Sequence, residues 1–196
     1  MGEASDPGGD LLRGGSPKEI LARLVDGDPL EVRARCKEQL HLRALLLSLD
    51  RLQLRTVARI AYAAPRWRGE PPLGRWLVER IEHSMKELID EDGEAVLSGI
   101  PDPEATDERY AFLSSLLGIE PQLGQRACVA FNAQPEPVRK AFFAVLIEGQ
   151  RFNRYVAEGN GSPQEVKGYL RAAFRALGLA DEFRRRPPTE GGYDDF

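Results

Sequence analysis

The segment that decides the fold is QPEPVRKAFFAVLIEGQRFNRYVAEGNGSPQEVKGYLRAAFRAL, residues 134–177. Within it, Ser162-Pro163-Gln164-Glu165 predicts a helix start, because Ser followed three residues later by Glu forms a capping box and Pro is favoured at the first helical position. A shorter helix predicted over Phe152–Glu158 precedes it, and Gly159-Asn160-Gly161 separates the two. Two helices joined by a tight turn that contains glycine predict a helix-turn-helix.

This region is basic, although the whole chain has a formal charge of −4. Residues 134–186 hold ten Arg or Lys against six Asp or Glu, a net of +4, which leaves −8 for the remainder. The second helix of a helix-turn-helix enters the major groove of DNA, where cationic side chains meet phosphates. A helical hairpin with a merely solvated basic face is the alternative. The candidate DNA-binding residues are Arg154, Ser162, Gln164, Lys167, Arg171 and Arg175.

The rest of the chain also shows helical spacing of apolar residues and no strand alternation. A second capping box, Ser16-Pro17-Lys18-Glu19, predicts a helix that begins at Pro17. Further helices are expected from Asp28 towards Leu49, over Leu52–Ala64 and from Leu73 to about Asp90. The fold class is therefore predicted to be all-α, with two helical domains joined by a linker. The expected divisions are a disordered N-terminus (1–15), a four-helix domain (16–92), a linker with a short helix (93–119), a helix-turn-helix domain (120–183) and a disordered tail (184–196).

Composition narrows the class of protein. The 196 residues are 42% hydrophobic and 30% charged, and the roughly 18 consecutive apolar residues of a membrane-spanning helix do not occur. The N-terminus lacks the basic and apolar regions of a secretory signal, so a soluble cytoplasmic protein is expected, without membrane association. Cys36 and Cys128 lie in apolar helical patterns and are expected to be buried thiols.

Enzymatic chemistry finds little support in the sequence. The densest titratable cluster is Asp90-Glu91-Asp92 with His83, but consecutive helical residues point to different faces, which favours a solvated helix end. No Gly-rich phosphate loop, nucleophile motif or metal-ligand spacing is present. We therefore expect neither an enzyme nor a small-molecule substrate, and no cofactor or metal.

At residues 134–177 the chain resembles, without gaps, the C-terminal helix-turn-helix domain of bacterial RNA polymerase sigma factors of the extracytoplasmic-function type, in the sigma-70 family. The resemblance implies that the domain at 120–183 is sigma region-4-like and reads promoter DNA. The matching positions are Pro135, Glu136, Arg139, Phe142, Glu148, Gly149, Ser162, Val166, Lys167, Leu170, Arg175, Ala176 and Leu177.

The first domain resembles the other module of the same family, which makes it sigma region-2-like. Arg66-Trp67-Arg68-Gly69-Glu70, followed by Trp76-Leu77, is similar to the family's RFRGEASFRTWL segment. The resemblance implies a divergent transcription regulator that associates with core RNA polymerase or another protein partner. The residues that it assigns to this contact are Arg51, Gln53, Arg55, Trp67 and Trp76.

Two departures from the family pattern leave a second hypothesis open. The family's acidic D-L-x-Q-E motif corresponds here to Arg51–Arg55, with arginine at both ends, and arginine repels a basic partner surface. The helix after Trp76 is acidic from Glu79 to Glu94, where the family carries basic residues. The alternative is a repurposed sigma fold, a protein-binding adaptor or decoy without promoter-opening activity.

Overall fold

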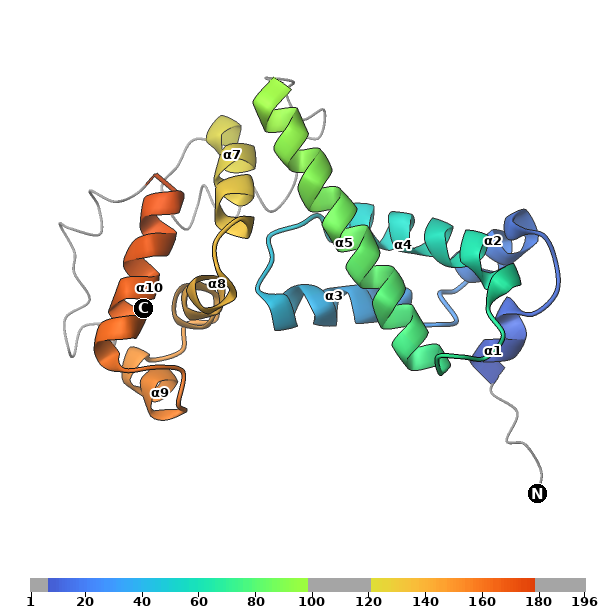
Figure 1. Cartoon of the computed structure of the whole chain (residues 1–196), viewed down its shortest axis with the longest axis horizontal. Coiled ribbons are helices and arrows are strands. Elements are labelled where there is room, and N and C mark those ends of the chain that lie inside the picture. Colours follow the sequence, from blue (N-terminus) through green and yellow to red (C-terminus); the bar gives the residue numbers. More distant parts are fainter. Residues whose placement is uncertain (1–6, 99–120, 179–196) are drawn as a thin grey trace. The chain divides into compact units, whose positions relative to one another are not determined.

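The computed structural model of the chain describes residues 7–98 and 121–178 (Figure 1). Throughout these two ranges the regular elements are helices, and no residue is in a β-strand. The predicted all-α fold class is therefore confirmed.

The chain divides into two compact units. Of the described residues, those up to Leu42 and Leu47–Glu91 form the first unit, and Arg43–Leu46 groups with those from Asp92 onward in the second. The second unit is therefore discontinuous in sequence, which the sequence pattern did not predict.

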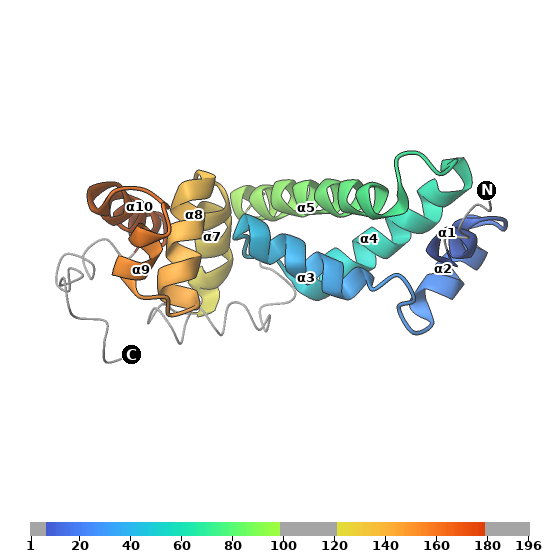
Figure 2. The same cartoon turned by 90° about the horizontal axis from the view of Figure 1, so that it is seen from below.

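The first unit is built on a helical core. Helix α2 (Pro17–Val25) packs on α4 (Leu49–Ala63), and Figure 2 shows α5 (Leu73–Ser98) lying across α3 (Val32–Arg43) and α4. Its fully buried side chains include Ile20, Leu24, Leu52, Leu77 and Ile81. The elements that begin in this unit are α1 (Pro7–Leu12), α2 (Pro17–Val25), α3 (Val32–Arg43), α4 (Leu49–Ala63), the 3₁₀ turn η1 (Ala64–Arg66) and α5 (Leu73–Ser98).

The capping box predicted at the start of α2 is present. Ser16 Oγ accepts a hydrogen bond from the Glu19 backbone N–H at 3.4 Å, and Glu19 Oε2 accepts one from the Ser16 backbone N–H at 2.7 Å. Each side chain thus satisfies a backbone donor that has no partner within the helix.

The long helix predicted from Asp28 to Leu49 is wrong at both ends. Asp28 acts as a cap for a helix that begins four residues later, since its carboxylate accepts hydrogen bonds from the backbone N–H groups of Val32 (2.7 Å) and Arg33 (2.9 Å). Helix α3 then stops at Arg43, and Ala44 has a positive φ of 49°. Residues 45–47 are leucines that lie buried outside any helix, so an apolar run was mistaken for helical continuation.

The disorder predicted for residues 1–15 is wrong over Pro7–Leu12, which form α1. Leu12 is only 1% exposed, so burial of this side chain offsets the low helix propensity of the neighbouring glycines. The Arg23 guanidinium also donates hydrogen bonds to the carbonyl oxygens of Leu11 (2.9 Å) and Gly14 (2.6 Å). Together these contacts order a segment whose composition resembles a flexible terminus.

Helix α5 is longer than predicted and continues to Ser98, so the linker expected from residue 93 is wrong over Gly93–Ser98. A glycine in a helix interior costs about 1 kcal/mol relative to alanine, which a long helix with Glu, Ala, Val and Leu after the glycine tolerates. The remainder of the predicted linker with its short helix (99–119) and the predicted tail (184–196) lie outside the described residues.

The second unit packs around aromatic side chains. The Phe131 and Phe142 ring centroids lie 5.1 Å apart, and Phe174 contacts Phe142 edge-on at 6.0 Å. The helical elements that follow residue 120 are α7 (Pro121–Asn132), α8 (Glu136–Phe142), the π-helical turn η2 (Phe143–Ile147), α9 (Phe152–Ala157) and α10 (Pro163–Ala176).

The segment Arg43–Leu46 is held in the second unit by hydrogen bonds to its backbone. The Asn132 side chain accepts from the Leu46 N–H at 2.8 Å and donates to the Leu46 carbonyl at 3.0 Å. Arg139 Nε donates to the Arg43 carbonyl at 3.2 Å. Asn132 is buried, so the oxygen and the nitrogen of its amide each pair with a backbone group that would otherwise lack a hydrogen-bond partner.

Two further expectations concern single features of the described chain. Cys36 and Cys128 are free thiols and both are buried, as predicted. None of the described helices has the length and apolar character needed to cross a membrane.

Candidate nucleic-acid interface

The predicted helix, turn and second helix are present as α9, residues 158–162 and α10. The turn depends on two glycines, because Gly159 and Gly161 have φ values of 86° and 120°, which side-chain-bearing residues rarely adopt. Between them, Asn160 Nδ2 donates a hydrogen bond to the Tyr155 carbonyl at 3.0 Å. This contact satisfies a carbonyl near the end of α9 and fixes the path into α10.

Ser162 is the N-cap of α10 and the predicted capping box is present. Its Oγ accepts from the Glu165 N–H at 3.3 Å, and Glu165 Oε2 accepts from the Ser162 N–H at 2.8 Å. The hydrogen bond from the Ser162 backbone N–H lowers the pKa of Glu165, and a hydrogen bond with the Ser162 side chain lowers it further. The Ser162 hydroxyl is thus engaged in starting the helix, and its candidate role at DNA is secondary to that.

The two faces of α10 differ sharply. Val166, Leu170 and Ala173 are each 0% exposed and anchor the helix in the core. On the opposite side, Gln164, Gly168, Arg171 and Arg175 are all exposed, and their spacing places them on one face over successive turns. We call these four residues the α10 stripe. It unites three of the six candidate DNA-binding residues.

Lys167 lies beside the stripe and is partly buried. Its ammonium group lies 5.9 Å from the centroid of the Phe152 ring, within the range of a cation–π contact. Phe152 is the first residue of α9, so this contact joins the two helices of the motif. Sequence analysis missed the role of Phe152, although an aromatic residue at the start of the first helix was the available signal.

Arg154 lies on α9 and its charge is compensated. Its Nε contacts Glu158 Oε1 at 3.0 Å, and Glu158 also accepts a hydrogen bond from Gln150 Nε2 at 2.8 Å. These bonds, with that from Gln150 the stronger influence, lower the pKa of Glu158. The same side chains line an open cleft of about 550 Å³ together with Glu148, Gly149 and Arg151.

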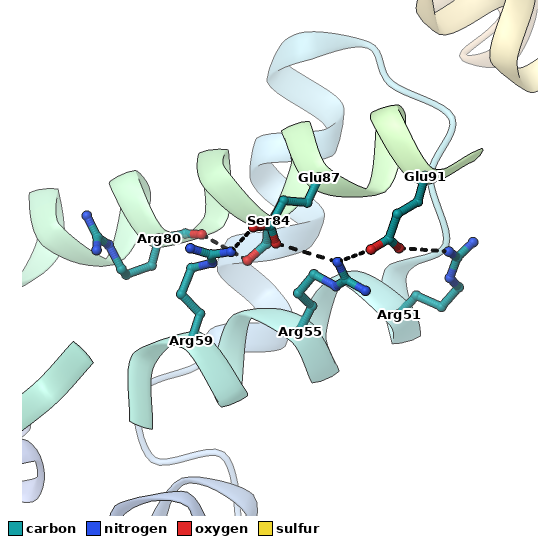
Figure 3. Close-up of polar contacts among 7 residues, drawn as sticks. All are labelled: Arg51, Arg55, Arg59, Arg80, Ser84, Glu87 and Glu91. Atoms are coloured by element: carbon teal, nitrogen blue, oxygen red, sulfur yellow. Dashed lines mark hydrogen bonds and ion pairs between the residues drawn. The ribbon is translucent and has the colours of Figure 1, made fainter. Parts of the chain in front are cut away.

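The candidate partner-contact residues Arg51 and Arg55 lie on α4 in the first unit, where they face α5 (Figure 3). Arg55 Nη1 lies 2.5 Å from Glu91 Oε1 and 3.5 Å from Glu87 Oε2, and Arg51 Nη2 lies 3.7 Å from Glu91 Oε2. Arg59 extends the series by a hydrogen-bonded ion pair with Glu87. We call these five residues the Arg–Glu ladder.

The Arg–Glu ladder partly compensates the charges of both α4 and α5. The hydrogen bond from Arg59 lowers the pKa of Glu87, burial opposes this shift, and the charges of Arg59 and Arg55 lower the pKa further. The carboxylates of α5 and the arginines of α4 thus neutralise each other in part. Arg–Glu spacing of four residues on both helices was the signal that could have predicted this.

The remaining partner-contact candidates are arranged differently. Gln53 Oε1 accepts a hydrogen bond from Arg33 at 2.8 Å. Trp67 is partly buried, donates from Nε1 to the Pro71 carbonyl at 2.9 Å, and lies 5.6 Å from Trp76 between ring centroids. Trp76 is 5% exposed and belongs to the core, and the Arg80 guanidinium lies 5.6 Å from its ring centroid.

Sequence analysis also missed an apolar surface on α4. Leu54 is 71% exposed and Tyr62 is 65% exposed, and Ala58 between them is exposed as well. The spacing of four residues puts the three side chains in a row. The Arg66 guanidinium lies 5.5 Å from the Tyr62 ring centroid, at one end of this row.

Comparison of the whole chain with protein-family models, with curated proteins and with solved structures found no match in any of the three. The likeness to sigma factors therefore rests on the residues quoted under the sequence analysis.

Proposed function

We propose that this protein is a sigma-factor-like transcription regulator, which binds promoter DNA through the helix-turn-helix of α9 and α10 and associates with RNA polymerase. The observation that carries the proposal is the α10 stripe. It presents Gln164, Arg171 and Arg175 outward from a capped helix whose opposite face is fully buried.

The chemistry of the stripe suits a DNA duplex. Arg171 and Arg175 supply guanidinium groups, which bind phosphate oxygens and the O6 and N7 atoms of guanine. Gln164, near the N-terminus of the helix, carries an amide that pairs with the N6 and N7 atoms of adenine. In a helix-turn-helix it is the N-terminal part of the second helix that contacts base edges.

The test is the salt dependence of DNA binding. The full chain is titrated against a labelled random-sequence duplex, and the affinity is measured by fluorescence anisotropy at several salt concentrations. We expect binding that weakens with salt, and the double variant Arg171→Glu/Arg175→Glu should reduce the slope of log K against log salt by about two. Affinity and slope unchanged in this variant would contradict the proposal.

A matched control changes the same number of charges away from the stripe. Lys86 on α5 and Arg126 on α7 are exposed, so Lys86→Glu/Arg126→Glu makes an equal change in net charge. It should leave the slope close to that of the wild type. An equal decrease of the slope in both double variants would mean that DNA binding depends on net charge and not on the α10 stripe.

A second candidate function is a repurposed sigma fold, a protein-binding adaptor or decoy without promoter-opening activity. It is favoured by two observations on α4. Arginines of the Arg–Glu ladder occupy the positions that the resemblance expects to be acidic. Beside them Leu54 and Tyr62 expose apolar surface, which is common where another protein docks.

The two candidates differ in binding to core RNA polymerase. A pull-down of the purified chain with core polymerase, with an authentic sigma factor as competitor, should show competitive binding if the first is correct. Retention that the competitor does not reduce, or no retention of a chain folded by circular dichroism, would favour the second. Leu54→Ser/Tyr62→Ser tests whether the exposed row on α4 contributes.

A further inference from the structure

Gly168 occupies an unexpected position for a glycine. It lies inside α10, is exposed, and has a helical backbone, in contrast to Gly159 and Gly161 with their positive φ values. Among residues other than proline, glycine is the least favourable in a helix interior. The backbone conformation therefore does not require glycine here.

Packing within the chain does not require it either. Apart from the adjacent backbone of α10, a Cβ atom at Gly168 would meet no heavy atom within 4 Å, whereas one at Gly161 would lie 3.6 Å from side-chain atoms of Glu165 and Val166. Any side chain at position 168 would extend into open space on the exposed face of the helix. A residue of higher helix propensity would therefore fit at position 168, where the α10 stripe has glycine.

The neighbours of Gly168 supply a reason. Gln164 lies one turn before it on the stripe, and Arg171 and Arg175 lie one and two turns after it. Three long polar side chains thus surround a position at which the helix backbone is bare. Glycine at such a position permits a close approach between the backbone and a ligand.

We propose that Gly168 is a specificity-determining residue of the DNA interface, a notch that lets the α10 backbone approach the duplex closely. This inference rests on the proposed function. Without a side chain at 168, the helix sits deep enough for Gln164 and Arg171 to reach base edges together. A methyl group there holds the helix outward, so that phosphate contacts survive and base contacts weaken.

The test uses a duplex sequence enriched from a random pool by the wild-type full chain. Gly168→Ala should lower affinity for the enriched duplex by about tenfold, and Gly168→Leu by more, because contacts to base edges are lost. Affinity for random-sequence duplex should change little in both. The thermal unfolding midpoint of Gly168→Ala should rise, which excludes misfolding as the cause.

Gly93 provides the control, since it also lies in a helix and a Cβ there would meet no heavy atom within 4 Å. Gly93→Ala should raise the unfolding midpoint and leave both affinities unchanged. Equal affinity of wild type and Gly168→Ala for the enriched duplex would contradict the proposed role of Gly168 and leave the proposed DNA binding unaffected. A wild-type chain that binds no duplex would overturn the proposed function itself.

Discussion

Arg55 on α4 and Glu91 on α5 form an ion pair with 2.5 Å between Nη1 and Oε1, at the centre of the Arg–Glu ladder. The arginines occupy successive turns of one helix and the glutamates successive turns of the other, so each carboxylate contacts two arginines. The arginines that the sequence predicted to repel a basic partner surface are thus paired with glutamates inside the first unit.

Removal of the ladder carboxylates should destabilise the first unit. Glu87→Gln/Glu91→Gln removes the carboxylates that the three arginines of the ladder contact, and partly exposed pairs of this kind contribute about 0.2–1 kcal/mol each. We expect the free energy of unfolding in urea to fall by about 1–2 kcal/mol. Glu94→Gln, an exposed change on the same helix, should have almost no effect. A double variant as stable as the wild type would mean that the ladder contributes nothing.

The stabilising effect of Glu87 should depend on pH in a defined direction. Because the hydrogen bond from Arg59 lowers the pKa of Glu87 below its ordinary value of 4.5, the folded chain favours the ionised form. The contribution is therefore complete above that value and is lost as the pH falls through the lower pKa of the folded state. Unfolding free energies of wild type and Glu87→Gln should converge in acid, and a difference that persists or grows there would contradict this.

Ser162 should stabilise α10 through its role as N-cap. Ser162→Ala removes the oxygen that accepts from the Glu165 N–H, and losses of this kind cost about 1 kcal/mol. Ser162→Asp keeps a capping oxygen and should be nearly as stable as the wild type. Urea unfolding measures this difference. If alanine and aspartate at this position prove equally stable, the cap has no energetic role.

The buried thiols should be unreactive in the native chain. Burial raises the pKa of Cys36 to about 11, although its hydrogen bond with Thr56 acts in the opposite direction. The reactive thiolate is therefore scarce near neutral pH, and the sulfur is also shielded from the reagent. A thiol-specific chromogenic reagent should modify Cys36 and Cys128 quickly only in denaturant. Rapid modification of the folded chain would show that these sites open readily.

The elements that could be predicted from sequence are those that local chemistry determines. The capping boxes at Ser16 and Ser162 need only residues three apart, and both are present. The end of α3 was missed because residues 45–47 are leucines, which suit a buried extended segment as well as a helix. The disorder expected at Pro7–Leu12 failed because Arg23, which bonds this region, comes later in the sequence.

The candidate site shows the same division between local and distant determinants. The spacing of Gln164, Arg171 and Arg175 places them on one face of any helix, so local sequence determines this part of the α10 stripe, although the sequence analysis did not draw that conclusion. The ion partners of Arg51 and Arg55 are harder to predict from sequence, since Glu91 lies 36 residues from Arg55 and the pairing depends on how α4 and α5 pack. Cation–π contact between Lys167 and Phe152 likewise depends on the angle between α9 and α10.

The bonds between Asn132 and Leu46 have a consequence for biosynthesis. The two residues are 86 positions apart, so the helix-turn-helix unit acquires one of its core leucines from chain made long before α7. In a ribosome-bound nascent chain, residues 43–46 therefore lack these contacts until α7 and α8 have emerged. A C-terminal fragment that begins at Pro121 would lack both backbone partners of the Asn132 amide and the buried Leu46 side chain, and should fold less stably than the same unit within the full chain.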